Sequence, residues 1–298
     1  MPVGQERRRA IVFGGTGQLG TELTRVFAER GWEVKPFERR QVDVTDAAAV
    51  EAVIGQMDPG VVLNAAAYNQ VDIAEREPLA AYSGNGLAVR NMAVACRQND
   101  SLLVHFSTDY VFDGEAGRPY TEEDWPHPLS AYGVSKLAGE LYAQAYLERY
   151  LIIRTCGVFG PAGLRTARGN FVELMLRLAA EGKPIRVVED HVASPTYAPA
   201  LAERTADLVE RGLTGLFHIG GGQAISWFEY ARLIFQAAGV EAQLTPTNER
   251  EYRTLARRPR FSALSNAKME AAGIAPMPPL KEALRLYMAA RRQMQSPA

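Results

Sequence analysis

A glycine-rich turn between an apolar run and a helical pattern places the strongest constraint on the fold of this chain. Residues 10–13 are apolar and end at Gly14-Gly15-Thr16-Gly17-Gln18-Leu19-Gly20, after which a helical pattern continues to a stop at Gly31. Strand, glycine turn and helix form the context that a dinucleotide-binding loop requires. Glycines 14, 17 and 20 let the backbone approach a pyrophosphate at a helix N-terminus. The spacing is GxxGxxG rather than GxGxxG, and the alternative is an ordinary strand-to-helix turn.

Apolar runs and helical patterns alternate through the first half of the chain. The apolar runs after the first one occupy residues 32–37, 61–63, 102–106 and 151–154. Amphipathic stretches separate them, and the longest of these cover 78–97 and 131–149. Runs that are apolar on both faces and alternate with helices predict an α/β fold, a Rossmann-like doubly wound parallel sheet.

The second half of the chain is more broken. We expect helices and short strands there at 170–180, 185–188, 199–211, 216–219, 226–238, 265–272 and 280–291. The predicted NAD(P)-binding domain covers residues 1–155, and later segments near 192–218 return to it. Residues 156–298 are expected to form mainly a smaller, interleaved substrate-binding lobe.

Tyr132 and Lys136 form the strongest candidate for chemistry. They stand four residues apart at the start of an amphipathic segment, so on a helix they share one face. An ammonium beside a phenol lowers a pKa that starts near ~10, which makes tyrosine a usable acid near neutral pH. Thr108 adds a hydroxyl after the run at 102–106, and the three groups suit proton delivery to a carbonyl oxygen as hydride arrives. The alternative is an exposed tyrosine beside a solvated lysine.

The residues after the second predicted strand point to the adenosine end of a cofactor. An acidic residue there selects NAD, whereas a basic one accommodates the 2′-phosphate of NADP. Glu38 is followed by Arg39 and Arg40, so NADPH is expected with NADH as a second cofactor, and the alternative is a solvated charged turn. Asp43 ends a short strand and is placed to meet the adenine edge. Asn85 lies inside a predicted helix, where its amide can instead bond to neighbouring backbone.

Composition argues against several functional classes. The net charge is −1, so nothing global points to nucleic acid or to an anionic membrane surface. Cys96 and Cys156 lie far apart and are expected to be reduced thiols in a cytoplasmic protein. The four histidines form no cluster in the sequence, and neither HExxH nor CxxC occurs, so no metal-centred mechanism is expected. The first nine residues are polar and basic, unlike a signal peptide, and no apolar run approaches the ~18 residues of a membrane span.

These motifs resemble the extended short-chain dehydrogenase/reductase family, and within it the branch of dTDP-4-dehydrorhamnose reductases. The resemblance covers nearly the whole chain after the first nine residues. It rests on Gly17-Gln18-Leu19-Gly20, Asn64 to Tyr68 with Val71-Asp72, Ser107-Thr-Asp-Tyr-Val-Phe112, Tyr132-Gly-x-x-Lys136, Asn170-Phe171, Ser194-Pro195-Thr196 and Arg258-Pro259-x-x-Ser262. Related 4,6-dehydratases carry Thr-Asp-Glu where this chain has Thr108-Asp109-Tyr110, which argues against dehydration.

The resemblance implies an NAD(P)H-dependent reduction of the 4-keto group of a dTDP-6-deoxy-hexulose, the last step of dTDP-rhamnose biosynthesis. It makes Thr108, Tyr132 and Lys136 the catalytic trio, in which Tyr132 protonates the C4 oxygen and Lys136 also holds the nicotinamide ribose. The cofactor-binding residues expected from the motifs and the resemblance are Gly14, Gly17, Gln18, Leu19, Arg39, Arg40, Asp43, Val44, Ala65, Ala66, Ala67, Tyr68, Asn85, Ser107, Tyr132 and Lys136. Those expected at the substrate are Asn69, Val71, Asp109, Tyr110, Gly157 and Phe261.

Two positions depart from the branch, and both belong to the substrate pocket. The branch usually has Arg-Thr-Ser-Trp where this chain has Arg154-Thr155-Cys156-Gly157, so a ring that packs on the substrate is missing. We expect Phe261 to cover that face of the sugar instead. Asn69 stands where the branch favours threonine. The alternatives are a reductase or an epimerase of another nucleotide sugar, or a non-catalytic regulatory protein similar to the regulatory subunit of methionine adenosyltransferase.

The resemblance also bears on metals and assembly. Some members of the branch use Mg²⁺ at a dimer contact, and Glu189-Asp190 is an acidic pair in a suitable region; the alternative is a solvated loop end. The expected partner is a dTDP-sugar, with neither nucleic acid nor membrane, and the expected assembly is a monomer or a homodimer.

Overall fold

A six-stranded parallel sheet organises the molecule. The computed structural model describes residues 7–166 and 169–295 and orders the strands β2-β1-β3-β4-β5-β8. The strands are β1 (Arg9–Phe13), β2 (Glu33–Phe37), β3 (Val61–Asn64), β4 (Leu102–Thr108), β5 (Tyr150–Thr155) and β8 (Gly215–His218). Every neighbouring pair is parallel, so the predicted Rossmann-like, doubly wound sheet is confirmed.

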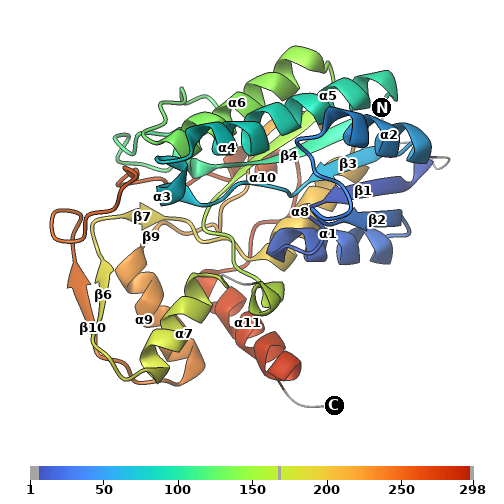
Figure 1. Ribbon diagram of the computed structural model, residues 1–298. Coiled ribbons are helices and arrows are strands. Elements are labelled where there is room, and N and C mark those ends of the chain that lie inside the picture. The colour runs from blue at the N-terminus through green and yellow to red at the C-terminus, as the bar shows by residue number, and fades with distance from the viewer. Residues whose placement is uncertain (1–6, 167–168, 296–298) are drawn as a thin grey trace.

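Successive side chains of the strands enter two separate cores, one on each face of the sheet. Ala10 and Val12 of β1 belong to one core, whereas Ile11 and Phe13 belong to the other. Five helices cover the two faces (Figure 1): α1 (Gln18–Glu29) and α8 (Ala198–Glu210) on the first, and α2 (Ala47–Met57), α5 (Ala88–Gln98) and α6 (Ala131–Tyr146) on the second. Burial on both faces is why the inner strands β1, β3, β4 and β5 are nearly continuous apolar runs in the sequence.

The predicted helix at 78–97 consists of three consecutive helical segments. A π-helical turn (Ser83–Leu87) separates α4 (Pro78–Tyr82) from α5. A Cβ at Gly84 would lie 3.4 Å from the Cβ of Tyr68, and one at Gly86 would lie 3.3 Å from the Cβ of Ala138. The widened turn therefore lets the Tyr68 loop and α6 pack closely against it, and π-turns are frequent at functional sites.

Side chains cap three helices that matter for the site. Asp46 accepts hydrogen bonds from Ala48 N and Ala49 N at the start of α2. Ser226 accepts one from Glu229 N at the start of α9 (Trp227–Ala238). Ser130 caps α6 through Gly133 N at 3.2 Å and so fixes where the helix that carries Tyr132 begins. None of the helices in the described residues combines the length and the apolar content needed to cross a membrane.

The second half of the chain adds a smaller lobe beside the sheet (Figure 1). Its core lies between α7 (Phe171–Ala180), α9 and α11 (Leu280–Gln295) and the parallel pair of β6 (Ile185–Val188) and β10 (Leu244–Thr247). The other short elements are α3 (Val71–Ala74), β7 (Val192–Ala193), β9 (Ile225–Ser226) and α10 (Ala267–Ala271). The elements α3, β7, β9 and β10 were not predicted from the sequence, because runs of two to four residues show no clear periodicity. The chain returns to the sheet through α8 and β8.

Candidate active site

The glycine turn lies where the strand order of the sheet reverses. β1 pairs with β2 on one side and with β3 on the other. Gly14 has φ +75°, and a Cβ there would lie 2.8 Å from the backbone of Ala65 and Ala66, which follow β3. The turn after β1 and the loop after β3 therefore touch, and only glycine fits at the contact. The crevice outside such a reversal point is where doubly wound sheets bind nucleotides.

The start of α1 has the groups that a pyrophosphate needs. Gly17 is the N-cap residue, and among the described residues no side chain caps it and the first turn holds no acidic residue. The first backbone bond back into the turn runs from Thr21 N to Gly17 O at 3.0 Å. The N–H groups of Gln18 and Leu19 precede that bond, and such groups at a helix N-terminus bind phosphate oxygens. These residues fit a dinucleotide cofactor.

The side chain of Gln18 has a different partner. Its Oε1 accepts hydrogen bonds from Asn170 Nδ2 at 2.8 Å and from Gly160 N at 3.2 Å. Gln18 therefore offers its backbone to an anion while its side chain ties the glycine turn to the lobe.

The predicted ribose and adenine residues lie at the edge of the sheet. Phe37 O at the end of β2 accepts from Gly14 N at 3.0 Å, so this strand end borders the glycine turn. The side chains of Arg39 and Arg40 are 85% and 92% exposed, which leaves both guanidinium groups accessible. Hydrogen bonds from Thr45 N and Oγ1 and the neighbouring Arg39 lower the pKa of Asp43 below its usual value. Val44 is held through its carbonyl by Asn91 Nδ2 at 3.2 Å.

Asn85 of the π-helical turn holds the loop after β3. Its Oδ1 accepts from Tyr68 N at 2.8 Å, and its Nδ2 donates to Tyr68 O at 2.9 Å and to Ser135 Oγ at 2.9 Å. Both the oxygen and the nitrogen of the Asn85 amide are thus bonded to protein. This is the alternative stated for Asn85 in the sequence, in which its amide bonds to neighbouring backbone. Ala67 lies beside this clamp and is exposed.

The structure brings Thr108, Tyr132 and Lys136 together at the carboxyl end of β4. Thr108 is the last residue of β4, and the Tyr132 hydroxyl is hydrogen-bonded to it. Lys136 is 2% exposed, and its Nζ donates to Phe106 O of the same strand at 2.5 Å. Helix α6 reaches this position because Gly133 has no side chain to collide with Tyr110 O. The predicted spacing on one helix face is confirmed.

The electrostatic part of the prediction is wrong in sign. Burial raises the pKa of Tyr132 to about 12, and the hydrogen bond with Thr108 only partly opposes this. Burial also lowers the pKa of Lys136 to about 8, against the field of Glu140, which raises it. Lys136 donates to the backbone of β4 instead, and its ammonium does not outweigh the effect of burial on Tyr132. A phenol with a raised pKa stays protonated at neutral pH, which suits a proton donor.

Ser107 belongs to a buried charge network that the sequence analysis missed. Its hydroxyl donates to Glu140 Oε1. Arg154 Nε donates to the same oxygen at 2.9 Å, and Arg154 Nη2 donates to Glu140 Oε2 at 2.7 Å. The side chains of Arg154 and Glu140 are 3% and 1% exposed. Glutamate on a helix usually faces solvent, so the sequence of α6 gives no sign that Glu140 is buried. The sign lies in the sheet register, which places Ser107 of β4 beside Arg154 of β5.

Asp109 is a buried carboxyl next to the trio. It accepts hydrogen bonds from Ser262 Oγ at 2.5 Å and from Thr108 Oγ1 at 3.1 Å, and a further one joins it to Cys156. Burial raises its pKa to about 6 although these three hydrogen bonds oppose the shift. The ring of Tyr110 meets that of Tyr132 edge-on at 6.0 Å, and burial raises the pKa of Tyr110.

Segments of the lobe meet the remaining predicted substrate residues. Val71 opens α3, where the next residue, Asp72, pairs with Arg258 Nη2 at 2.7 Å. Asn69 is exposed, and Phe261 is half-buried and pairs by backbone with Val192.

Trp227 meets the position of the missing ring. Gly157 has φ +49°, and a Cβ there would lie 3.3 Å from Trp227 Cη2. The Trp227 ring packs on that of Phe171, with a centroid distance of 4.7 Å. The sequence analysis did not consider Trp227, which lies 70 residues beyond Gly157 at the start of α9.

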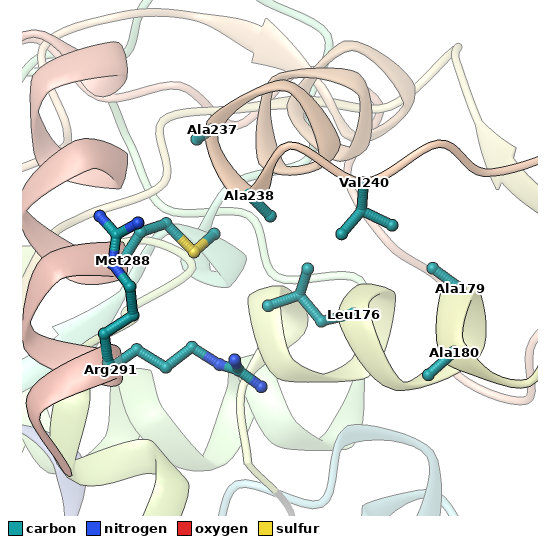
Figure 2. Close-up of a pocket in the computed structure, with 9 residues that line it drawn as sticks. Leu176, Ala179, Ala180, Ala237, Ala238, Val240, Met288 and Arg291 are labelled. Atoms are coloured by element: carbon teal, nitrogen blue, oxygen red, sulfur yellow. The ribbon is translucent and has the colours of Figure 1, made fainter. Parts of the chain in front are cut away.

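Two other regions hold none of the predicted catalytic residues. A cavity of ≈ 340 Å³ lies between α7, α9 and α11 and is lined mostly by apolar side chains, among them Leu176, Val240 and Met288 (Figure 2). Near the Glu189-Asp190 pair, both oxygens of Asp190 accept from Glu249 N. Across residues 7–166 and 169–295, no group of three or more His, Cys, Asp or Glu could hold a metal ion.

Comparison with known proteins places this geometry in a family. Residues 8–293 match the family described as RmlD substrate binding domain. The spore coat polysaccharide biosynthesis protein SpsK of Bacillus subtilis is 36% identical over 283 residues, which cover 95% of this chain and 98% of SpsK. The dTDP-4-dehydrorhamnose reductase of Streptomyces griseus is 37% identical over 278 residues, covering 91% and 90% of the two chains.

A solved structure agrees with these matches. The crystal structure of dTDP-4-dehydrorhamnose reductase from Bacillus anthracis in complex with NADP superposes with a TM-score of 0.90 at 34% identity, covering 94% of this chain and 98% of that one. The chain belongs to the RmlD substrate binding domain family, within the extended short-chain dehydrogenases/reductases.

Proposed function

We propose that this protein reduces the 4-keto group of dTDP-4-dehydrorhamnose to give dTDP-L-rhamnose, with NADPH as the reductant. The observation that carries the proposal is the meeting of Thr108, Tyr132 and Lys136 at the end of β4, beside the reversal point of the sheet. Relatives named dTDP-4-dehydrorhamnose reductase, of which one solved structure is in complex with NADP, support the substrate and the cofactor.

Tyr132 has the environment of a proton donor to the C4 oxygen. Its phenol is protonated at neutral pH because burial raises its pKa to about 12. Thr108 fixes the direction of the hydroxyl through their hydrogen bond. When bound, the nicotinamide supplies the hydride to C4. Lys136 places a buried positive charge below Tyr132 on the same helix face, where it stabilises the phenolate left after proton transfer.

The remaining cofactor contacts follow from the positions of the predicted residues. Gly14, Gly17, Gln18 and Leu19 would hold the pyrophosphate by backbone, and Arg39 with Arg40 would pair with the 2′-phosphate. Asp43 and Val44 would border the adenine. Ala65 to Tyr68 would border the nicotinamide-side ribose, with Asn85 holding the loop from behind. On this proposal residues 1–155 and the returning segment near 192–218 bind the cofactor.

Residues 156–298 would mainly bind the sugar nucleotide. Asp109, Tyr110, Asn69 and Val71 would approach the sugar from the sheet side, while Gly157 and Phe261 would approach it from the lobe side. The reaction would take place in the cytoplasm, which suits the two free, buried cysteines Cys96 and Cys156. We expect a monomer or a homodimer.

The direct test is turnover by the purified protein. NADPH and dTDP-4-dehydrorhamnose are mixed with the protein, cofactor oxidation is followed by absorbance, and the product is identified by NMR. We expect stoichiometric NADPH oxidation and dTDP-L-rhamnose. Oxidation only with another 4-keto nucleotide sugar would identify a different reductase. Interconversion of two nucleotide sugars without net oxidation would identify an epimerase. Binding of NADPH without turnover of any 4-keto nucleotide sugar would favour the non-catalytic alternative.

A further inference from the structure

Glu140 is a buried carboxylate that lies between two buried cations, Arg154 and Lys136, the second of which belongs to the catalytic trio. Glu140 stands four residues after Lys136 on α6, so the two side chains share one helix face. On its other side Glu140 is held by Arg154 through Nε and Nη2, and by the hydroxyl of Ser107. Lys136 and Glu140 are 2% and 1% exposed, so water screens their interaction weakly.

We propose that Glu140, fixed by Arg154 and Ser107, is a positioning residue that keeps the Lys136 ammonium charged beside the catalytic site. This inference rests on the proposed reduction and adds to it a residue that does not touch substrate or cofactor. The structure offers no other nearby anion for the task among the described residues of α6, β4 and β5, since the acceptor that Lys136 itself contacts is the neutral Phe106 carbonyl.

The charge balance around Lys136 supports this assignment. Burial lowers the pKa of Lys136 to about 8 even though Glu140 raises it, so without the charge of Glu140 the ammonium would lose its proton at lower pH. His105 of β4 adds no positive charge, since burial and the field of Lys136 hold its pKa well below the usual value. Tyr132 on the same helix is neutral at these pH values, and Asp109 of the turn after β4 interacts with Tyr132 rather than with Lys136. Tyr82 and Arg90 contact the far end of α6, at Tyr142 and Tyr146.

Arg154 determines whether Glu140 can keep Lys136 charged. Without a cation to pair with, a carboxylate as deeply buried as this one would carry a large desolvation cost. The two-pronged contact with Arg154 provides that cation in a fixed geometry, and the face of the Phe112 ring lies 5.0 Å from the guanidinium carbon. The charge of Glu140 therefore depends on Arg154, and the charge of Lys136 depends on Glu140.

The decisive variant is Glu140→Gln, which keeps the size and an acceptor oxygen but removes the charge. The pH at which kcat/KM falls on the alkaline side should move down by about one to three units, the usual effect of one nearby opposite charge. Lowering the pH should then restore much of the lost activity, because Lys136 regains its proton. A purely structural role predicts loss of activity that acid does not restore, and that result would overturn the proposal.

A matched control exists in the lobe. Glu173 accepts from Arg291 Nε at 2.8 Å and from Tyr287 Oη at 2.7 Å, so it is also held by an arginine and a hydroxyl. Glu173→Gln should lower the melting temperature without moving the pH profile. Glu140→Asp, which keeps the charge, should stay close to the wild-type pH profile; a shift as large as that of Glu140→Gln would contradict the proposal.

Lysine NMR gives a readout that is independent of turnover. The chain has only five lysines, so the Nζ titration of Lys136 can be assigned with a Lys136→Met reference. We expect Lys136 to titrate near pH 8 in the wild type and at lower pH in Glu140→Gln. Equal titration in both proteins would refute the role of Glu140. If the wild type fails to reduce the sugar nucleotide, the proposed function fails, yet this titration still decides the electrostatic claim. If Glu140→Gln does not fold, a Lys136 titration in Glu140→Asp far below that of the wild type would contradict the proposal.

Discussion

Tyr132 is the residue on which the proposed chemistry depends most. Its hydroxyl is hydrogen-bonded to Thr108, and its raised pKa keeps it protonated. Tyr132→Phe removes that proton and little else, so kcat should fall by about 10²–10⁴-fold. The dissociation constant for NADPH, measured by fluorescence titration, should change little. Tyr142→Phe is the control, since Tyr142 lies on the same helix but bonds to Tyr82 Oη. Near-normal kcat in Tyr132→Phe would remove Tyr132 from its role.

Arg39 and Arg40 are the residues expected to distinguish the two nicotinamide cofactors. Both guanidinium groups are largely exposed after β2, and Arg39 is held only by a 3.5 Å contact with Asp43. Exchange of both residues for alanine should raise the KM for NADPH more than the KM for NADH, because only NADPH carries the 2′-phosphate. NADH kinetics on the same protein serve as the internal control. An equal rise in both constants would show that the arginines are solvated and do not select the cofactor.

Among single residues, those whose role depends on spacing along one helix could be predicted from the sequence. The pair Tyr132 and Lys136 is recognisable because four residues make one helical face. The pKa values were not predictable, because they depend on burial that only the assembled sheet creates. Glu140 was missed for the same reason, since its partner Arg154 lies on a neighbouring strand and is brought close by sheet register.

The glycine turn is the element whose geometry is least tolerant of change. Gly14→Ala would place a methyl group 2.8 Å from the backbone of Ala65 at a positive φ. We expect a lower melting temperature and much weaker NADPH binding, measured by calorimetry and titration. Gly55→Ala is the matched control, because Gly55 lies inside α2 with nothing within 4 Å of a new Cβ. That substitution should stabilise the protein by about 0.5–1 kcal/mol without altering NADPH binding. Normal cofactor affinity in Gly14→Ala would contradict the close approach of the two loops.

Elements with strong periodicity were predictable and those without it were not. The sheet strands and the helices α1, α6, α8 and α9 follow from apolar runs, caps and glycine stops, with ends that differ by a few residues. The division of the helix at 78–97 was not predictable, because the π-helical turn exists to fit Tyr68 and Ala138, which are distant in sequence. β10 has the sequence Leu-Thr-Pro-Thr, and its pairing with β6 depends on the lobe closing around both.

The whole molecule is held in one arrangement by contacts between the lobe and the predicted site loops. Asp72 pairs with Arg258, Asp109 accepts from Ser262, and Gln18 accepts from Asn170. Each contact joins a residue of a predicted site loop to a segment beyond residue 156. Such contacts between distant segments cannot be read from local patterns, and they explain why the site is completed only by the second half of the chain.

Trp227 and Gly157 provide the test at this scale, since they join α9 of the lobe to the end of β5. Thr155 pairs with Thr108 in the sheet, so Gly157 lies two residues beyond the level of the trio. The Trp227 ring lies 3.3 Å from a Cβ built on Gly157 and packs edge-on against Phe171. An aromatic side chain buries ~150–250 Å², so a ring in this position would cover a large part of a sugar. We therefore expect Trp227, from another element, to cover the sugar face that Gly157 leaves open.

Trp227→Ala should raise the KM for dTDP-4-dehydrorhamnose severalfold while kcat changes less, because binding surface is lost but the trio is untouched. Phe261→Ala is the comparison, since Phe261 is the residue that the sequence alone favoured for this position. A larger effect in Phe261→Ala than in Trp227→Ala would restore that prediction.

Gly157→Trp should be poorly folded, because its backbone has φ +49° and its ring would meet Trp227. Trp227→Ala should partly rescue Gly157→Trp by vacating the space, although the strain of the positive φ remains. If neither single alanine variant changes the KM, no aromatic side chain tested covers the sugar, and the protein would act on a substrate other than the rhamnose precursor.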